Sequence, residues 1–486
     1  MICQRLPNTF VGLTDSSRPA IFYSFSFAPN YRWSTFHPPG REIVQYLQEV
    51  CAKYGIVDKV QLNTEVAELR YLVDQEIWEA KLLYLAPGVG DLTSKERQHH
   101  VNEKGRDNVI LKEELIRAKV VCSAAGGLVE PNTWPESIPG IETFEGDLFH
   151  SARWNHNLDL NDKDVIVVGT GCSAAQLVPK LPKAPYNARS VTQLMRSPPW
   201  VVPKPQPLFG AEKWEKHTPA LFSTIPGLGR FFRTLIFLGA ERDFFQMFPD
   251  NDYSAKARKK IESGLVDHMK RSVPEKYHEM LTPDYGVGCK RRIFDETWFP
   301  ALHNPVIELT TLPLTSIQPK GVTLGPGRTY PDPKNNNSKV PTDERKLTAN
   351  VIVLANGFET TTWLHPLRVK GKDGRLMQDI WDERGGPQAY MGAAMDNYPN
   401  LFLIFGPNTA TGHSSVILAS ENMVNYSIHF IKRILYGDVK TFEVKEEAEI
   451  KWTKMMQEYL KDTVWESSGC HSWYHNDSGW NATVYP

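Results

Sequence analysis

The chain lacks several features that mark large classes of protein. Its six cysteines are scattered along 486 residues without a C-x-x-C pair, so neither a zinc site nor a disulfide framework is expected, and the thiols are expected to be reduced. Lys+Arg 55 against Asp+Glu 56 gives a net charge of -1, which excludes a global positive field for nucleic acid. Any recognition of phosphate must therefore be local.

Membrane and repeat signals are also missing. The N-terminus has no basic stretch followed by an apolar one, and no internal repeat or low-complexity tract is found. The most apolar stretch, 231–245, is interrupted by charged residues too early for a helix that spans a bilayer. We expect a cytoplasmic enzyme of two or three domains, with no metal, no nucleic-acid partner and no membrane span.

A nucleotide-binding loop is indicated near the middle of the chain. The apolar run 165–168 is typical of a buried strand, and a helix-like stretch follows a few residues later. Between them the pattern G-x-G-x-x-A is formed by Gly169, Thr170, Gly171, Cys172, Ser173 and Ala174. The first glycine permits a tight turn, the second lets the backbone approach a pyrophosphate, and the alanine keeps the helix close to the strand. An ordinary strand-to-helix turn is the alternative to dinucleotide binding.

The end of the next strand favours NADPH over NADH. This strand should cover 191–194, and Arg196 follows it where an acidic residue would hold a ribose hydroxyl. A guanidinium can grip a 2′-phosphate through charge-assisted bonds, whereas a carboxylate would repel it. A solvated surface arginine is the alternative.

A longer pattern precedes the nucleotide loop. Phe144, Gly146, His150 and Trp154 form F-x-G-x-x-x-H-x-x-x-W, which resembles the fingerprint of Baeyer–Villiger monooxygenases, with Asn155 where that family usually has Pro or Asp. Further stretches resemble the same family in the same order, at 23–30, 288–291, 355–358, 399–402 and 406–408. The resemblance covers nearly the whole chain.

This resemblance implies an α/β fold with two Rossmann-like dinucleotide-binding domains, one for FAD and one for NADPH, and a helical insertion. It also implies that FAD carries the redox chemistry, that NADPH reduces it, and that O2 supplies one oxygen atom to a ketone, giving an ester or lactone. Aromatic residues between 222 and 248 suggest a pocket for a bulky ketone of the secondary-metabolite type.

The resemblance also assigns roles to single residues. Arg291 becomes the catalytic cation that stabilises negative charge as it develops on oxygen, and Lys290 joins Arg196 at the 2′-phosphate. His150 and Trp154 are expected to control conformation at the link between domains, with a structural histidine and a core tryptophan as the alternatives. The residues expected near FAD are Ala124, Gly126, Asn356, Gly357, Gly406, Pro407 and Asn408.

The expected domains are discontinuous. The FAD domain should comprise 1–155 and 351–486, and the NADPH domain 162–204 and 286–350, with the helical insertion at 205–285. The first forty residues contain two glycines, Gly12 and Gly40, so they have no G-x-G-x-x-G loop. We therefore expect that the first FAD-binding strand and its loop are missing and that the chain is truncated at the N-terminus. The alternatives are an N- or S-hydroxylating flavin monooxygenase, an inactive NADPH-binding remnant, and a dehydrogenase without flavin.

Overall fold

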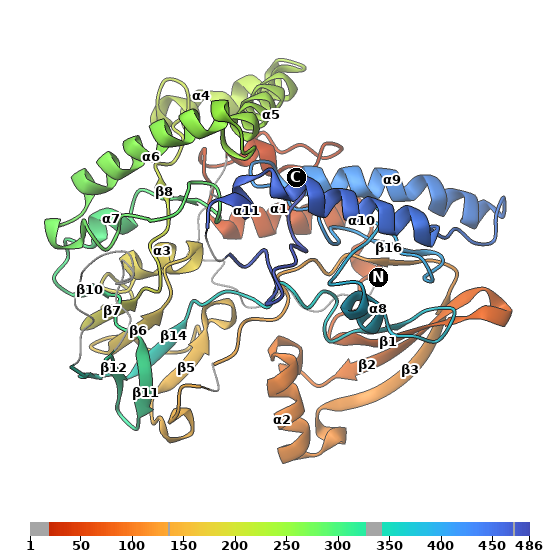
Figure 1. Cartoon of the computed structure of the whole chain (residues 1–486), viewed down its shortest axis with the longest axis horizontal. Helices are drawn as coiled ribbons and strands as arrows, with labels where there is room; N and C mark the ends of the chain where they lie inside the picture. Colours follow the sequence, from red (N-terminus) through yellow and green to blue (C-terminus); the bar gives the residue numbers. More distant parts are fainter. Residues whose placement is uncertain (1–18, 135–136, 327–342, 470–471) are drawn as a thin grey trace.

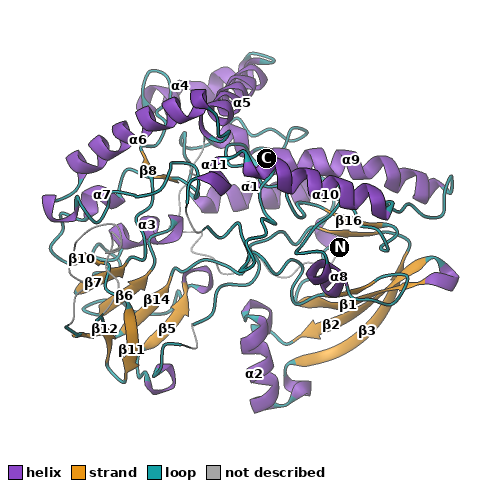
Figure 2. Ribbon diagram, in the orientation of Figure 1, coloured by secondary structure: helices purple, strands orange, loops and turns teal. Residues whose placement is uncertain are grey.

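Two lobes and a layer of helices make up the structure, a computed structural model that describes residues 19–134, 137–326, 343–469 and 472–486. One lobe holds a five-stranded sheet, and the other holds a four-stranded sheet and a pair of short strands (Figure 1). The long helices lie along the side of both lobes that is uppermost in Figure 2.

The five-stranded sheet is wholly parallel, in the order β10-β7-β6-β14-β5. Its strands are β5 (Asp147–His150), β6 (Asp164–Val168), β7 (Ser190–Leu194), β10 (Ile307–Thr310) and β14 (Val351–Leu354). The chain leaves β6 toward β7 and β10, and later returns to the other side of β6 as β14. Ligands of such sheets bind at the carboxyl ends of the strands where the winding reverses, which here is between β6 and β14.

The core of this sheet explains why the apolar run 165–168 forms a strand. Val165 and Val167 are completely buried, and so are Ala174 and Ala175 in the short helix α3 (Cys172–Leu177) that follows the loop. Side chains this small let helix and sheet come close together, as the G-x-G-x-x-A pattern requires.

The other lobe has a mixed sheet in the order β15-β1-β2-β3 and a separate parallel pair, β4 with β16. These strands are β1 (Thr64–Leu72), β2 (Ile77–Leu85), β3 (Ile110–Ala118), β4 (Val121–Ser123), β15 (Arg368–Lys370) and β16 (Leu401–Leu403). The helices of this lobe are α1 (Gly40–Lys53), α2 (Ser94–Lys104), α8 (Met377–Glu383), α9 (Val416–Tyr436), α10 (Glu446–Lys461) and α11 (Val464–Ser467). Among the described residues, β4 and β16 pair only with each other.

The range predicted as a helical insertion is helical. It contains α4 (Ala211–Thr224), α5 (Leu228–Met247) and α6 (Asp252–Ser272). The flanking strands β8 (Val201–Val202) and β9 (Ile293–Phe294) pair with each other, so the chain leaves and re-enters the domain at one place. The lobe of the five-stranded sheet also contains the short helix α7 (Trp298–Ala301) and a small antiparallel sheet. The strands of this small sheet are β11 (Leu314–Gln318), β12 (Gly321–Leu324) and β13 (Arg345–Thr348).

Three expectations need correction. The boundaries at 155 and 351 are wrong, because β5 and β14 both belong to the five-stranded sheet and pair with each other. A buried apolar run looks the same whichever sheet it joins, so the sequence could not assign these strands. The expectation of reduced thiols is wrong for Cys289, which is disulfide-bonded, whereas Cys51, Cys122 and Cys172 are free.

No single helix in the described ranges is long and apolar enough to cross a membrane. Helices α4 and α5 have the required length and composition only when taken together, and they are bent by 118° where they meet. The described residues contain no cluster of three or more His, Cys, Asp or Glu side chains that could hold a metal ion.

Candidate active site

A series of hydrogen bonds fixes the position of the nucleotide loop. The amide of Gly169 donates to the carbonyl of Leu194 on β7 over 2.9 Å, and the Gln193 side chain donates to the Gly169 carbonyl over 2.9 Å. The indole of Trp298 donates in turn to Oε1 of Gln193 over 2.8 Å. The sequence reasoning missed Gln193 and Trp298, although a glutamine inside an apolar strand was a signal that could have found the first.

The loop after β6 touches the segment after β14. Gly169 has φ +120°, and a Cβ atom on it would lie 2.4 Å from the carbonyl oxygen of Ala355. A Cβ atom on Gly171 would meet nothing within 4 Å. The packing of the two segments therefore requires a glycine at position 169. At Gly171 the backbone is exposed and faces open space, and Ser173 nearby is exposed as well. This is a cradle that a pyrophosphate can occupy.

The Lys290 side chain reaches the end of β7, next to Arg196 in the sequence. The Nζ of Lys290 donates to Oγ of Ser197 over 2.9 Å, and it lies 4.5 Å from the centre of the Tyr285 ring. Arg196, the residue before Ser197, is exposed and forms no ion pair within the described ranges. Thr170 reaches the same corner, since its hydroxyl donates to the Ser197 carbonyl over 3.3 Å. The pair is thus placed where it could bind a 2′-phosphate.

Arg291 and Arg292 have different surroundings although they are neighbours in sequence. Arg292 is only 8% exposed and pairs with Asp243 of α5 over 3.0 Å. Arg291 is half-buried, and its guanidinium has no carboxylate partner among the described residues. Burial raises the pKa values of Cys172 and Tyr474, and the nearby charge of Arg291 opposes both shifts. Arg291 is therefore a cation available at the edge of the nucleotide loop.

The fingerprint glycine is dictated by packing. A Cβ atom on Gly146 would lie 2.3 Å from the carbonyl oxygen of Asn350 and 2.6 Å from the ring of Phe144. Trp154 is 4% exposed and packs edge-to-face on Phe149, with 5.0 Å between the ring centres. These contacts give Phe144, Gly146 and Trp154 a place in the core of the five-stranded lobe.

His150 lies where the two lobes are joined. It ends β5, and its Nδ1 accepts a hydrogen bond from the Ala152 amide over 3.0 Å, so Nε2 carries the proton of the neutral ring. Burial lowers its pKa to about 4, and the proximity of Gly357 and Asn356 only partly opposes this shift. With this low pKa the ring is neutral at pH 7. It packs against Phe358, with 5.5 Å between ring centres, and so connects the end of β5 with the crossing after β14.

Two chain crossings run side by side between the lobes. The Asn132 amide donates to the Gly357 carbonyl, and its side chain donates to the Asn356 carbonyl, each over 3.0 Å. Pro131 and Phe358 extend this pairing as an isolated bridge. The first crossing starts just after β4 and the second just after β14, so both begin at carboxyl ends of parallel strands.

The expected FAD residues that follow β4 and β16 lie at one edge of the other lobe, whereas Asn356 and Gly357 lie on the crossing after β14. Because β4 and β16 are parallel and in register, the segments with Ala124 and Gly126 and with Gly406 and Pro407 both leave that edge. Gly126 has φ +74°, a conformation that glycine adopts easily. The Oδ1 atom of Asn356 is buried, and the Asn356 side chain lies at the His150 ring, whose pKa it raises against the larger lowering effect of burial.

The side-chain amide of Asn408 is bonded within the protein. It is 6% exposed, and its side-chain amide donates to the carbonyls of Asn481 over 2.8 Å and Val484 over 3.0 Å. Both protons of this amide are therefore used to fasten the segment 481–484 beside the loop. We interpret Asn408 as a residue that positions the loop.

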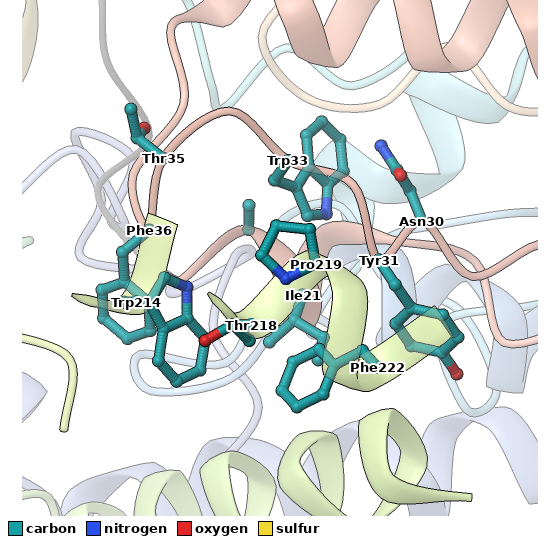
Figure 3. Close-up of a pocket in the computed structure, with 11 residues that line it drawn as sticks. Ile21, Asn30, Tyr31, Trp33, Thr35, Phe36, Trp214, Thr218, Pro219 and Phe222 are labelled. Atoms are coloured by element: carbon teal, nitrogen blue, oxygen red, sulfur yellow. The ribbon is translucent and has the colours of Figure 1, made fainter. Parts of the chain in front are cut away.

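A small pocket of about 20 Å³, lined by aromatic side chains, lies between residues 20–36 and α4 (Figure 3). Phe36 and Phe222 both pack against the Trp214 ring, with ring centres 4.9 and 5.7 Å from it. Two buried polar atoms at the pocket, Nε1 of Trp33 and Oγ1 of Thr35, have no hydrogen-bond partner. The pocket therefore has room for one small group, about the size of a water molecule, that accepts a hydrogen bond.

Solved structures with the same architecture are flavoprotein monooxygenases. An oxidized steroid monooxygenase bound to NADP is similar with a TM-score of 0.74 at 20% identity, covering 99% of this chain and 89% of that one. The OTEMO complex with FAD and NADP has a TM-score of 0.71 at 20% identity, covering 97% and 85%. At this identity the comparison establishes the fold, with its two dinucleotide-binding domains.

The sequence comparisons identify the family. The family model described as "FMO-like: Flavin-binding monooxygenase-like" matches residues 89–206. A Baeyer-Villiger monooxygenase of Streptomyces coelicolor is 31% identical over 476 residues, covering 96% of this chain and 79% of that protein. One of Pseudomonas aeruginosa is 29% identical, covering 96% and 77%. The chain belongs to the Baeyer–Villiger monooxygenase family, whose cofactors are FAD and NADPH.

Proposed function

We propose that this protein uses NADPH and O2 to insert one oxygen atom into a bulky apolar ketone, giving an ester or lactone. The observation that carries the proposal is Arg291, a half-buried guanidinium without a carboxylate partner in the described ranges. A cation in this state can stabilise negative charge that develops on oxygen in a site with little water.

The two lobes bind different cofactors. The backbone at Gly169 and Gly171 holds the pyrophosphate of NADPH, and Lys290 with Arg196 holds its 2′-phosphate. The segments after β4 and β16 hold FAD, which supplies the redox chemistry when it is bound. His150 and the paired crossings keep the lobes in register.

The aromatic lining of the small pocket beside α4 suits an apolar substrate, of which the pocket holds one small group. Its aromatic walls favour hydrocarbon rings, and the unpartnered donors of Trp33 and Thr35 suit a carbonyl oxygen. A substrate with neither feature would leave those donors unpaired, which would weaken its binding.

The test is spectroscopic. The purified protein is incubated with FAD, freed of excess flavin, and mixed with NADPH without air; we expect retained flavin absorbance that bleaches. Adding air with a series of bicyclic ketones should then increase NADPH consumption and give esters or lactones. Retained flavin with oxygenation of amines or sulfides, and not of ketones, would instead identify a heteroatom hydroxylase. Absence of retained flavin would contradict an active oxygenase.

A further inference from the structure

The outer face of α5 carries large apolar side chains that the described chain leaves uncovered. Phe231, Leu235, Leu238 and Phe245 recur at helical spacing and are 57%, 45%, 55% and 62% exposed. The opposite face packs on protein, where Met247 is 1% exposed. A row of large apolar side chains exposed on a protein surface marks a site where protein or lipid binds. We call the four exposed residues the α5 stripe.

Neighbouring elements extend the stripe at both ends. Ile225, in the turn before α5, is 46% exposed, and Tyr253, in the first turn of α6, is 63% exposed. The hydroxyl of Ser254 donates to the Phe245 carbonyl over 2.8 Å, which holds Tyr253 near the end of the stripe. The helices involved form the upper margin of the molecule in Figure 1, away from both sheets.

Basic side chains border this apolar surface. Arg242 lies within the stripe, three residues before Phe245, and Lys256 and Lys260 follow Tyr253 at i+3 and i+7 on the same face of α6. On α4 to α6, the exposed basic residues without an ion pair in the described ranges are Lys213, Lys216, Arg230, Arg242, Lys256, Lys259, Lys260, Lys270 and Arg271, and the acidic ones are Glu212, Glu215, Asp252 and Asp267. The surface is therefore positive, although the chain has a net charge of -1.

We propose that α4 to α6 dock in the plane of an anionic lipid surface, with the α5 stripe at the boundary between headgroups and acyl chains. An apolar helix face bordered by Lys and Arg is the pattern of interfacial helices. The 118° bend between α4 and α5 suits a hairpin that lies on a membrane. A second copy of the chain fits less well, because a two-fold contact would bring like charges together. This inference does not depend on ketone oxygenation.

Sedimentation with vesicles tests the docking. The FAD-loaded protein is mixed with vesicles of phosphatidylcholine alone or with added phosphatidylserine. We expect binding that needs phosphatidylserine and weakens with salt. Leu235→Glu with Leu238→Glu should lower the partition coefficient at least roughly tenfold, and Lys256→Glu with Lys260→Glu should lower it on the order of tenfold as well. Flavin content and circular dichroism verify that the variants are folded.

The matched control is Leu111→Glu with Leu115→Glu on β3, where the leucines are 61% and 62% exposed on another surface. This variant should bind vesicles as the parent protein does. The proposal is overturned if the parent protein binds neither kind of vesicle, or if the stripe and control variants lose binding equally. It is also overturned if the parent protein dimerises and only the stripe variant becomes monomeric, because the stripe is then an interface between copies.

Discussion

The Nζ atom of Lys290 lies 2.9 Å from Oγ of Ser197, immediately after Arg196 at the end of β7. This contact joins a residue beyond the helical insertion to the strand that follows the nucleotide loop. The two cations reach the corner where the ribose of a dinucleotide would lie, so they should determine the choice between NADPH and NADH.

Replacing Lys290 or Arg196 with alanine should therefore raise the KM for NADPH by about 10- to 100-fold, the effect of losing a charge-assisted hydrogen bond. The KM for NADH should stay nearly the same, because NADH has no 2′-phosphate. Steady-state oxidation of the two nucleotides measures this, with Lys104→Ala on α2 as a control. Equal losses with both nucleotides would show that the two cations do not recognise the phosphate.

Gly169 and Gly171 should respond differently to the same substitution. Gly169→Ala puts a methyl group 2.4 Å from the Ala355 carbonyl at φ +120°, and we expect a melting temperature several degrees lower. Gly171→Ala meets nothing within 4 Å, so the fold should keep its stability while the methyl group obstructs the pyrophosphate and NADPH binding weakens. Thermal melting and NADPH titration separate the two effects. A stable Gly169→Ala variant would contradict the packing described here.

Arg291 should affect oxygenation more than flavin reduction. In Arg291→Ala we expect ester formation to fall by about 100-fold or more, the usual cost of removing a group that stabilises developing charge. Arg291→Lys should recover part of the activity, because the charge remains. Flavin reduction under anaerobic conditions should stay within a few-fold of the parent rate. Equal loss of reduction and oxygenation would mean that Arg291 serves only to bind NADPH.

His150 should make the protein sensitive to acid. Its pKa is lowered from 6.5 to about 4 in the folded protein. Between pH 6.5 and about 4 the unfolded chain therefore binds a proton at this residue and the folded chain does not. Stability is then complete above about pH 6.5 and falls as the pH drops toward 4, by at most about 3 kcal/mol. His150→Asn keeps an acceptor for the Ala152 amide and should flatten this part of the melting profile. An unchanged profile would refute a buried neutral histidine.

The buried carboxyl groups of Glu449 and Asp396 should make the stability of the fold depend on pH between 4.5 and about 9. Burial and the neighbouring Asp396 raise the pKa of Glu449 to about 9 from 4.5, so the folded protein keeps a proton that the unfolded chain releases as the pH rises between these values. Stability should fall across this window. Glu449→Gln should make the melting temperature less dependent on pH, whereas Glu446→Gln, at the exposed end of the same Arg384 network, should not. Parallel profiles for all three proteins would contradict a shared buried proton.

Local patterns predicted the elements well, whereas partners distant in sequence could not be predicted. The G-x-G-x-x-A loop, with the strand before it and the helix after it, follows from spacing that a single segment contains. The boundaries at 155 and 351 failed because β5 and β14 are apolar runs whose sheet depends on the whole topology. Strand β3 was missed because its charged residues, such as Glu113 and Glu114, obscure the apolar alternation.

The same limit applies to the site. Lys290 and Arg196 are far apart in sequence, and only the resemblance to a family joined them; the contact of Lys290 with Ser197, the residue after Arg196, could not be predicted. The hydrogen bonds of Asn408 to Asn481 and Val484 could not be predicted because these partners lie far along the chain. Hydrogen bonds between distant segments leave no periodic signal.

Oxygen transfer is the measurement that tests the central claim most directly. The FAD-loaded protein is given NADPH, a bicyclic ketone and isotopically labelled O2, and the product is examined by mass spectrometry, with Arg291→Ala in parallel. The account predicts an ester or lactone that carries one labelled atom from the parent protein, and mainly peroxide from the variant. A product without label, or equal labelled product from both proteins, would contradict it.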